Sequence, residues 1–309
     1  MAFVLGLDGG ATKTECVLMD EAGRVRARSR SGPSNPVRAG VHGALAAVCE
    51  ACRVAVQSAS ISFAEVRVVC AGLAGTGEPH IQRRMQELLQ TEFPGTMAHV
   101  CTDFDLTMEA MGEGPAIVLI AGTGSVAIGR NADGQLARAG GRGPLLGDEG
   151  SAYDIGQRAA MASLRAWERT GAESSLGHSI LQAFGVTDWQ EFQVRAHAAA
   201  DEVFPKIFPL VAAAADAGDS SARLLLQAAA DDLATLVAVV MERLRFGDQS
   251  FSLAKSGGTL GVSPFFDAVL DERLRGIAPH ATRGVLSISP AEAAARLALR
   301  LLTTPAEGD

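Results

Sequence analysis

The sequence predicts an α/β protein built from two copies of one structural unit. Two glycine-rich turns, at residues 8–14 and 121–125, each join one apolar β-like run to another. A pattern of three short strands surrounds each turn, and alternating helical and strand-like patterns follow the first one. The repetition indicates a duplicated fold, and a chain of 309 residues is long enough for two domains.

The first half of the chain opens with three strands and continues with alternating helices and strands. A short apolar run ends at a Glu-Ala-Gly turn before the third strand, and an amphipathic helix pattern begins after a proline. The expected strands cover residues 1–7, 15–20, 24–29, 66–71 and 98–102, and the expected helices cover 37–58 and 81–90.

The second half repeats the three strands and then becomes alanine-rich. Glycine and proline interrupt a helical pattern between about residues 151 and 245, which predicts a helical subdomain inserted into the second unit. A closing helix is expected after Ser289-Pro290, which is typical of a helix start. The remaining strands are expected at 116–121, 126–130, 135–139 and 250–255, and the closing helix at 291–302.

The composition is that of an ordinary globular protein, with 48% hydrophobic and 20% charged residues. A net charge of -8 disfavours nucleic acid or an anionic membrane as a partner and favours a small ligand. Five cysteines between Cys16 and Cys101, without a secretory leader, favour a reducing cytoplasm over a disulfide framework. No apolar run is expected to reach transmembrane length.

The glycine turns have the composition of phosphate-binding loops. Glycine lets the backbone approach an anion, and consecutive N–H groups can donate to phosphate oxygens. The first turn is not a Walker A loop, because Ala11 and Thr12 stand where glycine and lysine are required. Hydroxyl groups are expected to add donors to each turn, namely those of Thr12, Thr14, Thr123 and Ser125. These features predict bound nucleotide phosphates and phosphoryl transfer, with plain hairpin turns as the alternative.

Asp103 follows an apolar strand, at the position where open α/β sheets place their ligands. A carboxylate there can orient an attacking hydroxyl and accept its proton. The alternative is that Asp103 or Asp105 caps a helix at residues 106–111.

Five segments, taken in order, resemble the sugar-kinase, actin and Hsp70 superfamily, and within it the N-acetylglucosamine kinase and BadF/BadG/BcrA/BcrD ATPase family. They are residues 7–14, 32–35, 102–103, 121–125 and 140–151. The resemblance implies two duplicated ribonuclease-H-like (actin-like ATPase) domains, each a mixed five-stranded sheet flanked by helices. The first domain is expected to cover 1–115 plus the C-terminal helix 290–305, and the second 116–289 with the helical insertion.

The same resemblance implies an ATP- and Mg²⁺-dependent sugar kinase that forms a homodimer. It would phosphorylate an amino sugar in the cleft between the domains, most directly N-acetylglucosamine to its 6-phosphate, with Asp103 as the general base. The implied ATP contacts are Asp8, Gly9, Gly10, Thr12, Lys13, Gly122, Thr123, Gly124, Gly257, Gly258 and Thr259, with Asp8 also holding hydrated Mg²⁺. The implied sugar contacts are Asn35, Asp103, Ser125, Gly141 and Asp148.

Several of these positions have a plainer interpretation. Lys13 can be a solvated surface side chain, Asn35 before a proline can be a turn residue, and the Asp148-Glu149 pair can begin a helix. Arg142 replaces the tryptophan that the family carries beside the sugar, which leaves the acceptor open and makes glucosamine the main competitor.

Two other classes of function fit less well. An ATPase activator of a reductase or dehydratase relays electrons through an iron–sulfur cluster and needs cysteine ligands, yet Cys49 and Cys52 are the only pair with suitable spacing. A chaperone or filament ATPase would carry an additional substrate-binding part. The six histidines are scattered along the chain, so the sequence predicts no zinc site.

Overall fold

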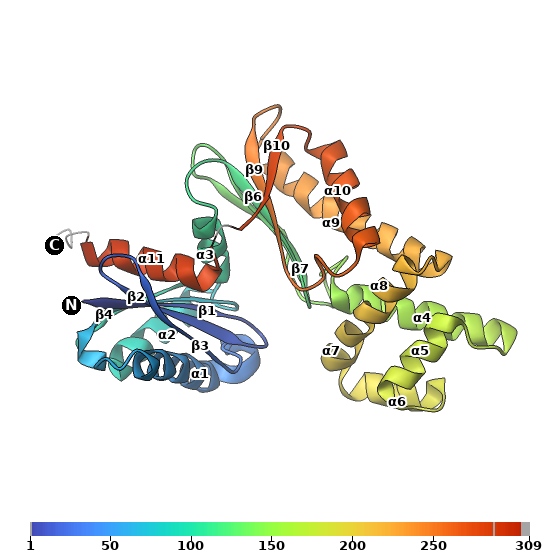
Figure 1. Ribbon diagram of the computed structural model, residues 1–309, viewed down its shortest axis with the longest axis horizontal. Coiled ribbons are helices and arrows are strands. Elements are labelled where there is room, and N and C mark those ends of the chain that lie inside the picture. Colours follow the sequence, from blue (N-terminus) through green and yellow to red (C-terminus); the bar gives the residue numbers. More distant parts are fainter. Residues whose placement is uncertain (1, 287, 304–309) are drawn as a thin grey trace. The chain divides into compact units, whose positions relative to one another are not determined.

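The computed structural model describes residues 2–286 and 288–303 and divides the chain into two compact units (Figure 1). The first unit combines Met1–Glu113 with Leu286–Asp309, and the second is Gly114–Val285. The division of the sequence into domains at 1–115, 116–289 and 290–305 stays a prediction, and its residues 304 and 305 lie outside the described part.

The first unit contains a five-stranded mixed sheet in the order β3-β2-β1-β4-β5. The strands β1, β2 and β3 are antiparallel neighbours, whereas β4 and β5 continue the sheet parallel to β1. The strands are β1 (Phe3–Gly9), β2 (Thr14–Asp20), β3 (Val25–Ser31), β4 (Val66–Leu73) and β5 (Met97–Thr102). The helices are α1 (Pro36–Ser58), a short 3-10 helix (Phe63–Glu65), α2 (Pro79–Glu92), α3 (Asp103–Ala110) and α11 (Pro290–Thr303).

Helices cover both faces of this sheet (Figure 1). One face packs against α1 and α2, and the other packs against α11, which also contacts α3. Small side chains bring α11 very close to the sheet, because a Cβ atom on Gly6 would lie 2.0 Å from the backbone nitrogen of Ala295. The buried face of α11 consists of alanines, namely Ala291, Ala294, Ala295 and Ala298.

The second unit repeats the sheet with the order β10-β9-β6-β7-β8. Again three antiparallel strands are extended by two parallel ones. The strands are β6 (Ala116–Ala121), β7 (Ser125–Arg130), β8 (Leu136–Gly140), β9 (Phe251–Ser256) and β10 (Ala281–Val285). The prediction of mixed five-stranded sheets flanked by helices is thereby confirmed, although the sequence had indicated no strand at β10.

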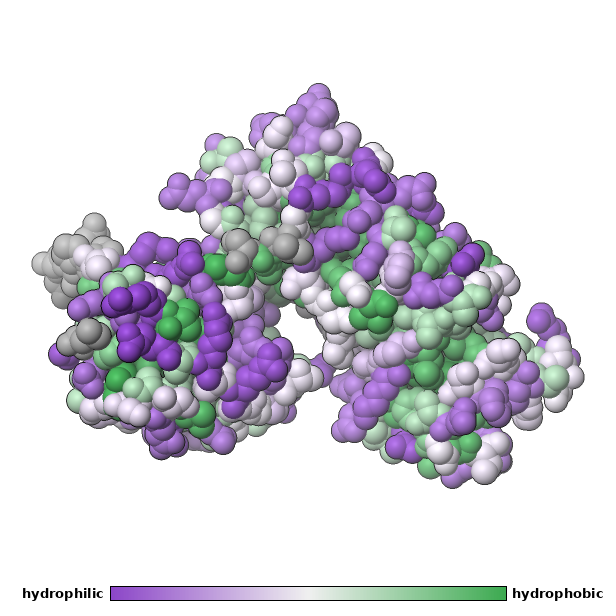
Figure 2. All heavy atoms as spheres, viewed as in Figure 1, coloured by the Kyte–Doolittle hydropathy of each residue, from purple (hydrophilic) through white to green (hydrophobic). Residues whose placement is uncertain are grey.

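Most helices of the second unit lie between β8 and β9. Helix α9 packs against β6, β7 and β8 and against α8 and α10. The helices are α4 (Ala152–Thr170), α5 (Ser175–Phe184), α6 (Trp189–Ala198), α7 (Ala200–Val203), a 3-10 helix (Phe204–Ile207), α8 (Phe208–Asp216), α9 (Ser220–Arg243) and α10 (Pro264–Ile277). On the visible face, apolar residues gather over these alanine-rich helices more than over the first unit (Figure 2).

Two helices correct the expectation that no apolar run reaches transmembrane length. Pro36–Ser58 and Ser220–Arg243 are long and apolar enough to cross a membrane by length and composition. Each packs against the sheet of its own unit, and their buried residues belong to the cores of those units. Core helices of this length pass the same test, so the two segments are explained by the fold.

Candidate active site

The first glycine turn joins β1 to β2 and is closed by backbone hydrogen bonding. The N–H of Gly10 donates to the carbonyl of Lys13 over 2.9 Å. Lys13 is exposed, and its Nζ lies 2.8 Å from Oε1 of Glu15. An exposed ion pair of this kind contributes little to stability, so the lysine can exchange its partner for a phosphate at small cost.

A second sequence segment holds this turn in place. The buried Thr14 hydroxyl lies 2.7 Å from both the Gly32 carbonyl and the Ser34 hydroxyl, and the Ser34 N–H donates to Gly10. A Cβ atom on Gly9 would lie 2.1 Å from Oγ of Ser34, so only glycine fits there. The turn and residues 32–35, singled out separately in the sequence, therefore form one structure.

Two carboxylates meet at this end of the sheet. Asp8 lies near the end of β1, and Asp103 follows β5 directly. Burial, the nearby Asp103 and Glu15 together raise the pKa of Asp8 to about 6, while Lys13 opposes the shift. The structure thus places Asp8 and Asp103 close enough for each to feel the other's charge, as expected for two residues at the carboxyl ends of parallel strands on one edge of the sheet.

The start of the helix after β5 distinguishes the roles of Asp103 and Asp105, which the sequence left as alternative helix caps. Thr102 is the N-cap residue of α3, and its backbone N–H donates to Asp105 in return, which forms a capping box. Asp103 is the first residue of the helix and does not cap it. Neither aspartate is therefore the N-cap, because the helix begins at Asp103, and Asp105 takes part in the cap as the third helical residue of the capping box.

Asn35 is the N-cap of α1, so its plainer interpretation is present in the structure. Its side-chain oxygen accepts from the N–H groups of Val37 and Arg38 over 2.9 and 3.2 Å. Gly40 interrupts α1 with a φ of 72°, so the cap serves one short turn. The capping bonds use only the side-chain oxygen and leave the amide nitrogen available to a ligand.

The second glycine turn joins β6 to β7 and faces the start of α4. The Gly122 carbonyl accepts from the Ala152 N–H over 2.8 Å, and the Gly122 N–H donates to Gly124. Thr123 at the tip is exposed. As in the first unit, one exposed threonine lies at the tip of a turn whose backbone is held by hydrogen bonds to another segment.

The third glycine cluster, after β9, packs directly on the second turn. Both the N–H and the hydroxyl of Thr259 donate to the Ala121 carbonyl, over 3.1 and 2.8 Å. Gly257 has a φ of +117°, and a Cβ atom there would lie 2.0 Å from the same carbonyl oxygen. Gly258 has open space around it. The two clusters that the sequence assigned to ATP are therefore neighbours in the second unit.

Asp148, Ser125 and Gly141 also gather at the second turn. Asp148 is buried, with a left-handed φ of 64°, and a Cβ atom on Gly124 would lie 2.6 Å from its carboxylate. Ser125 donates its hydroxyl to the Glu149 carbonyl, and its own carbonyl accepts from the Gly141 N–H. Asp148 precedes the N-cap of α4, Ser151, so it does not belong to the first turn of a helix.

Two expected hydroxyl donors are occupied inside the protein. Thr14 and Ser125 are buried and donate to carbonyl groups, so neither has a proton to offer a phosphate. Thr12 and Thr123 are exposed and remain candidates. Burial depends on partners from distant segments, which the composition of a turn does not reveal.

Comparison with known proteins finds relatives that match nearly the whole chain. The model of the BadF/BadG/BcrA/BcrD ATPase family matches residues 5–291. N-acetyl-D-glucosamine kinase of Dictyostelium discoideum is 29% identical over 96% of this chain and 97% of the relative. N-acetylmuramic acid/N-acetylglucosamine kinase of Clostridium acetobutylicum is 27% identical over 84% of this chain and 86% of its own.

Solved structures agree with the fold. A candidate N-acetylglucosamine kinase of Chromobacterium violaceum superposes with a TM-score of 0.78 at 26% identity, covering 97% of this chain and 99% of that one. The two sheets have the duplicated, ribonuclease-H-like arrangement of actin-like ATPase domains. The family and these relatives support the expectation of an ATP-dependent sugar kinase. The chain belongs to the BadF/BadG/BcrA/BcrD ATPase family.

Proposed function

We propose that the protein transfers the γ-phosphate of ATP to a hydroxyl of an amino sugar, most directly to the 6-hydroxyl of N-acetylglucosamine. The observation that carries the proposal is the pair of carboxylates at the end of the first sheet, Asp8 and Asp103. Asp103 is partly exposed, follows a strand end and is not used as a helix cap. It is therefore suited to orient the sugar hydroxyl and accept its proton.

Asp8 has the properties of a group that meets a cation through water. Its negative charge is poorly compensated, since burial and Asp103 are the largest causes of its raised pKa. Mg²⁺ prefers one or two carboxylates together with water and phosphate oxygens, so the oxygen donors here fit it. When bound, the ion would offset phosphate charge, while Asp8 orients its water ligands.

The remaining residues divide into phosphate and sugar contacts. We assign ATP to the turns around Gly9, Gly10, Thr12 and Lys13 in the first unit, and to residues 122–124 and 257–259 in the second. The sugar contacts that we propose are Asn35, Asp103, Ser125, Gly141 and Asp148. Ser125 can contribute only an acceptor, because its hydrogen is donated to Glu149.

The relatives narrow the acceptor but leave alternatives. Both are described as acting on N-acetylglucosamine, and one also on N-acetylmuramic acid. Arg142 is exposed, and its Cβ atom lies 3.4 Å from the position that a Cβ on Gly147, the residue before Asp148, would take. A guanidinium there can pair with the lactyl carboxylate of N-acetylmuramic acid, which makes that sugar our second candidate. Glucosamine is the simpler alternative.

The activator function is disfavoured by the state of the cysteines. All five are free and buried, whereas a cluster that passes electrons to a partner needs thiolates near the surface. Free thiols fit a reducing compartment, and we propose that the protein is cytoplasmic. We also propose that it forms a homodimer, as the family resemblance implies.

The deciding experiment measures ADP release with Mg²⁺-ATP and each sugar in parallel. The panel contains N-acetylglucosamine, N-acetylmuramic acid, glucosamine, N-acetylmannosamine, glucose and no sugar. We expect the fastest turnover with N-acetylglucosamine, and no phosphorylation of its 6-deoxy analogue. Equal ADP release without sugar would overturn the kinase proposal in favour of an activator. If N-acetylmuramic acid is used, Arg142→Ala should reduce its phosphorylation selectively.

A further inference from the structure

Three metal-binding side chains converge on the first sheet, on the face that α11 covers. Cys70 comes from β4, and His99 and Cys101 come from β5. Their ligand atoms all lie within 4.8 Å of one another. Among the residues that the structure describes, no other group of three or more histidine, cysteine or acidic side chains meets this condition.

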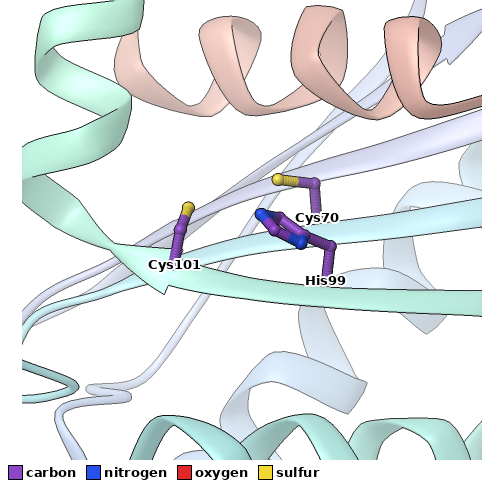
Figure 3. Close-up of side chains that lie close together, drawn as sticks. All are labelled: Cys70, His99 and Cys101. Carbon is purple, nitrogen blue, oxygen red and sulfur yellow. The ribbon is translucent and has the colours of Figure 1, made fainter. Parts of the chain in front are cut away.

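Strand pairing explains why sequence spacing did not reveal this group. Cys70 lies directly opposite His99 in the parallel β4–β5 ladder. Cys101 is two residues beyond His99 and therefore on the same face of its strand. Figure 3 shows the two sulfur atoms and the imidazole on one side of the sheet, beneath α11. The expectation of no zinc site considered the histidines along the chain and overlooked this register.

The surroundings combine a buried interior with a route to solvent. Cys70 is fully buried, Cys101 is 5% exposed, and both belong to the core under α11. His99 is partly exposed on β5, which is the edge strand of the sheet. An ion could enter past His99, and water could reach a fourth coordination position there.

The donors point to one type of cation. Two sulfur atoms and one imidazole suit Zn²⁺, whereas Mg²⁺ and Ca²⁺ require oxygen ligands. Tetrahedral Zn²⁺ bonds of about 2.0–2.3 Å place neighbouring donors about 3.5–3.8 Å apart. Because the ligand atoms lie within 4.8 Å of one another, the separations need to contract by at most about 1.3 Å to reach this geometry. We propose that Cys70, His99 and Cys101 form a zinc site, with an external ligand such as water completing the coordination.

A redox switch explains the cluster less well. The neighbouring Cys70 thiol and burial raise the pKa of Cys101. Thiol–disulfide chemistry requires the thiolate, which is found where the pKa is lowered. The Cys101 thiol is therefore a poor nucleophile, and binding of a cation would release its proton. None of the site's residues belongs to the proposed ATP or sugar contacts, and metal binding can be measured without the kinase reaction.

Cobalt titration tests the site directly, with the full-length chain kept reduced by a phosphine. Co²⁺ also replaces Mg²⁺ at oxygen sites, so the diagnostic signal is the sulfur-to-cobalt charge-transfer band. We expect one equivalent of Co²⁺ to produce this band and one equivalent of Zn²⁺ to abolish it by displacement. Zinc should also raise the melting temperature of the metal-free protein. Absence of the band in the wild type would overturn the proposal.

Variants identify the ligands. Cys70→Ser should lose the band. His99→Asn, at a partly exposed and therefore more tolerant position, should weaken Zn²⁺ binding by more than the roughly 10–100-fold that loss of a supporting residue costs. Cys49→Ser is the matched control, because Cys49 is a buried thiol in the core on the α1 face of the same sheet. Unchanged metal binding in His99→Asn, or equal loss in Cys49→Ser, would assign the metal elsewhere.

Discussion

The two glycine turns have the same architecture and carry different chemistry. In each, an exposed threonine stands at the tip, while a hydroxyl behind it, of Thr14 or Ser125, is buried and donates to a carbonyl group. The first turn is surrounded by charge, with Lys13 in the turn itself and Asp8 and Glu15 on its two flanking strands. The second is held mostly by uncharged contacts to residues 257–259 and the start of α4.

This difference indicates a division of labour within a duplicated fold. This neutral frame of N–H groups and glycines can accommodate phosphate, and the carboxylate beside it, that of Asp148 against Gly124, is one that we assign to the sugar. The charged turn, with Asp103 beside it, has groups that can bind a cation and move a proton. The duplication thus supplies two similar frames, and a few charged side chains in the first unit specify where the chemistry occurs.

The largest expected effect removes the proposed base from the charged turn. Asp103→Asn should lower kcat by about 10²–10⁴-fold, because the amide cannot accept the hydroxyl proton. The Kd for ATP should change little, since Asp103 is not a phosphate contact. Asp105→Asn is the control, because it makes the same change in the capping box two residues away. Steady-state kinetics of both variants decide the matter, and near-normal turnover of Asp103→Asn would remove it from the mechanism.

The next-largest effect concerns the neutral frame, where an added side chain should destabilise the protein by steric strain. Gly257→Ala places a Cβ atom 2.0 Å from the Ala121 carbonyl at a φ of +117°. The resulting strain should cost about 3 kcal/mol or more in unfolding free energy. Gly258→Ala, which meets no atom within 4 Å, should leave stability nearly unchanged and isolate any effect on ATP binding. Denaturant unfolding of the pair measures the difference, and equal stability of the two variants would contradict this account of the frame.

In the charged turn, the charge of Asp8 should instead lower the stability of the folded protein. The pKa of Asp8 is about 6 in the folded protein, against 3.8 for an unperturbed aspartate, so the folded protein holds its proton more tightly than the unfolded chain does. The stability penalty is therefore absent below pH 3.8, grows as the pH rises, and is complete above about pH 6. In a metal chelator, Asp8→Asn should raise the unfolding free energy by about 3 kcal/mol at pH 8 and by almost nothing at pH 3.5.

The charge of Glu15, on the neighbouring strand, should have the opposite effect and stabilise the folded protein. Burial alone would raise its pKa, but Lys13 and Arg30 outweigh burial and lower it. Glu15→Gln should therefore destabilise the protein at neutral pH, and this loss should disappear as the pH falls below the ordinary range of a glutamate. Denaturant unfolding of Asp8→Asn and Glu15→Gln at both pH values checks the two signs. A gain from Asp8→Asn at pH 3.5 as large as at pH 8 would show that the carboxylate charge is not its cause.

The sequence predicted those features of the fold and the site that depend on residues close together in the chain. Alternating strands, glycine turns and Asp103 at a strand end could be recognised because each depends on neighbouring residues. Strand β10 could not, since Ala281–Val285 is short, contains Arg283 and lies at the edge of its sheet. The Cys70, His99 and Cys101 cluster depends on the register between two strands, which no single segment encodes. The burial of Thr14 likewise depends on Gly32 and Ser34, far along the chain.

The smallest effect separates two roles of one side chain at the edge of the charged turn. Asn35 caps α1 through its oxygen, and its amide nitrogen is the part that we assign to the sugar. Asn35→Asp keeps an equally good cap and removes that donor, so stability should stay within about 0.5 kcal/mol. The KM for the sugar should rise by roughly five- to tenfold, as expected for about 1 kcal/mol of lost hydrogen bonding. Asn35→Ala should lose both the cap and the sugar contact. If Asn35→Asp left the sugar KM unchanged, Asn35 would be only a cap, and the sugar contacts proposed for the first unit would reduce to Asp103.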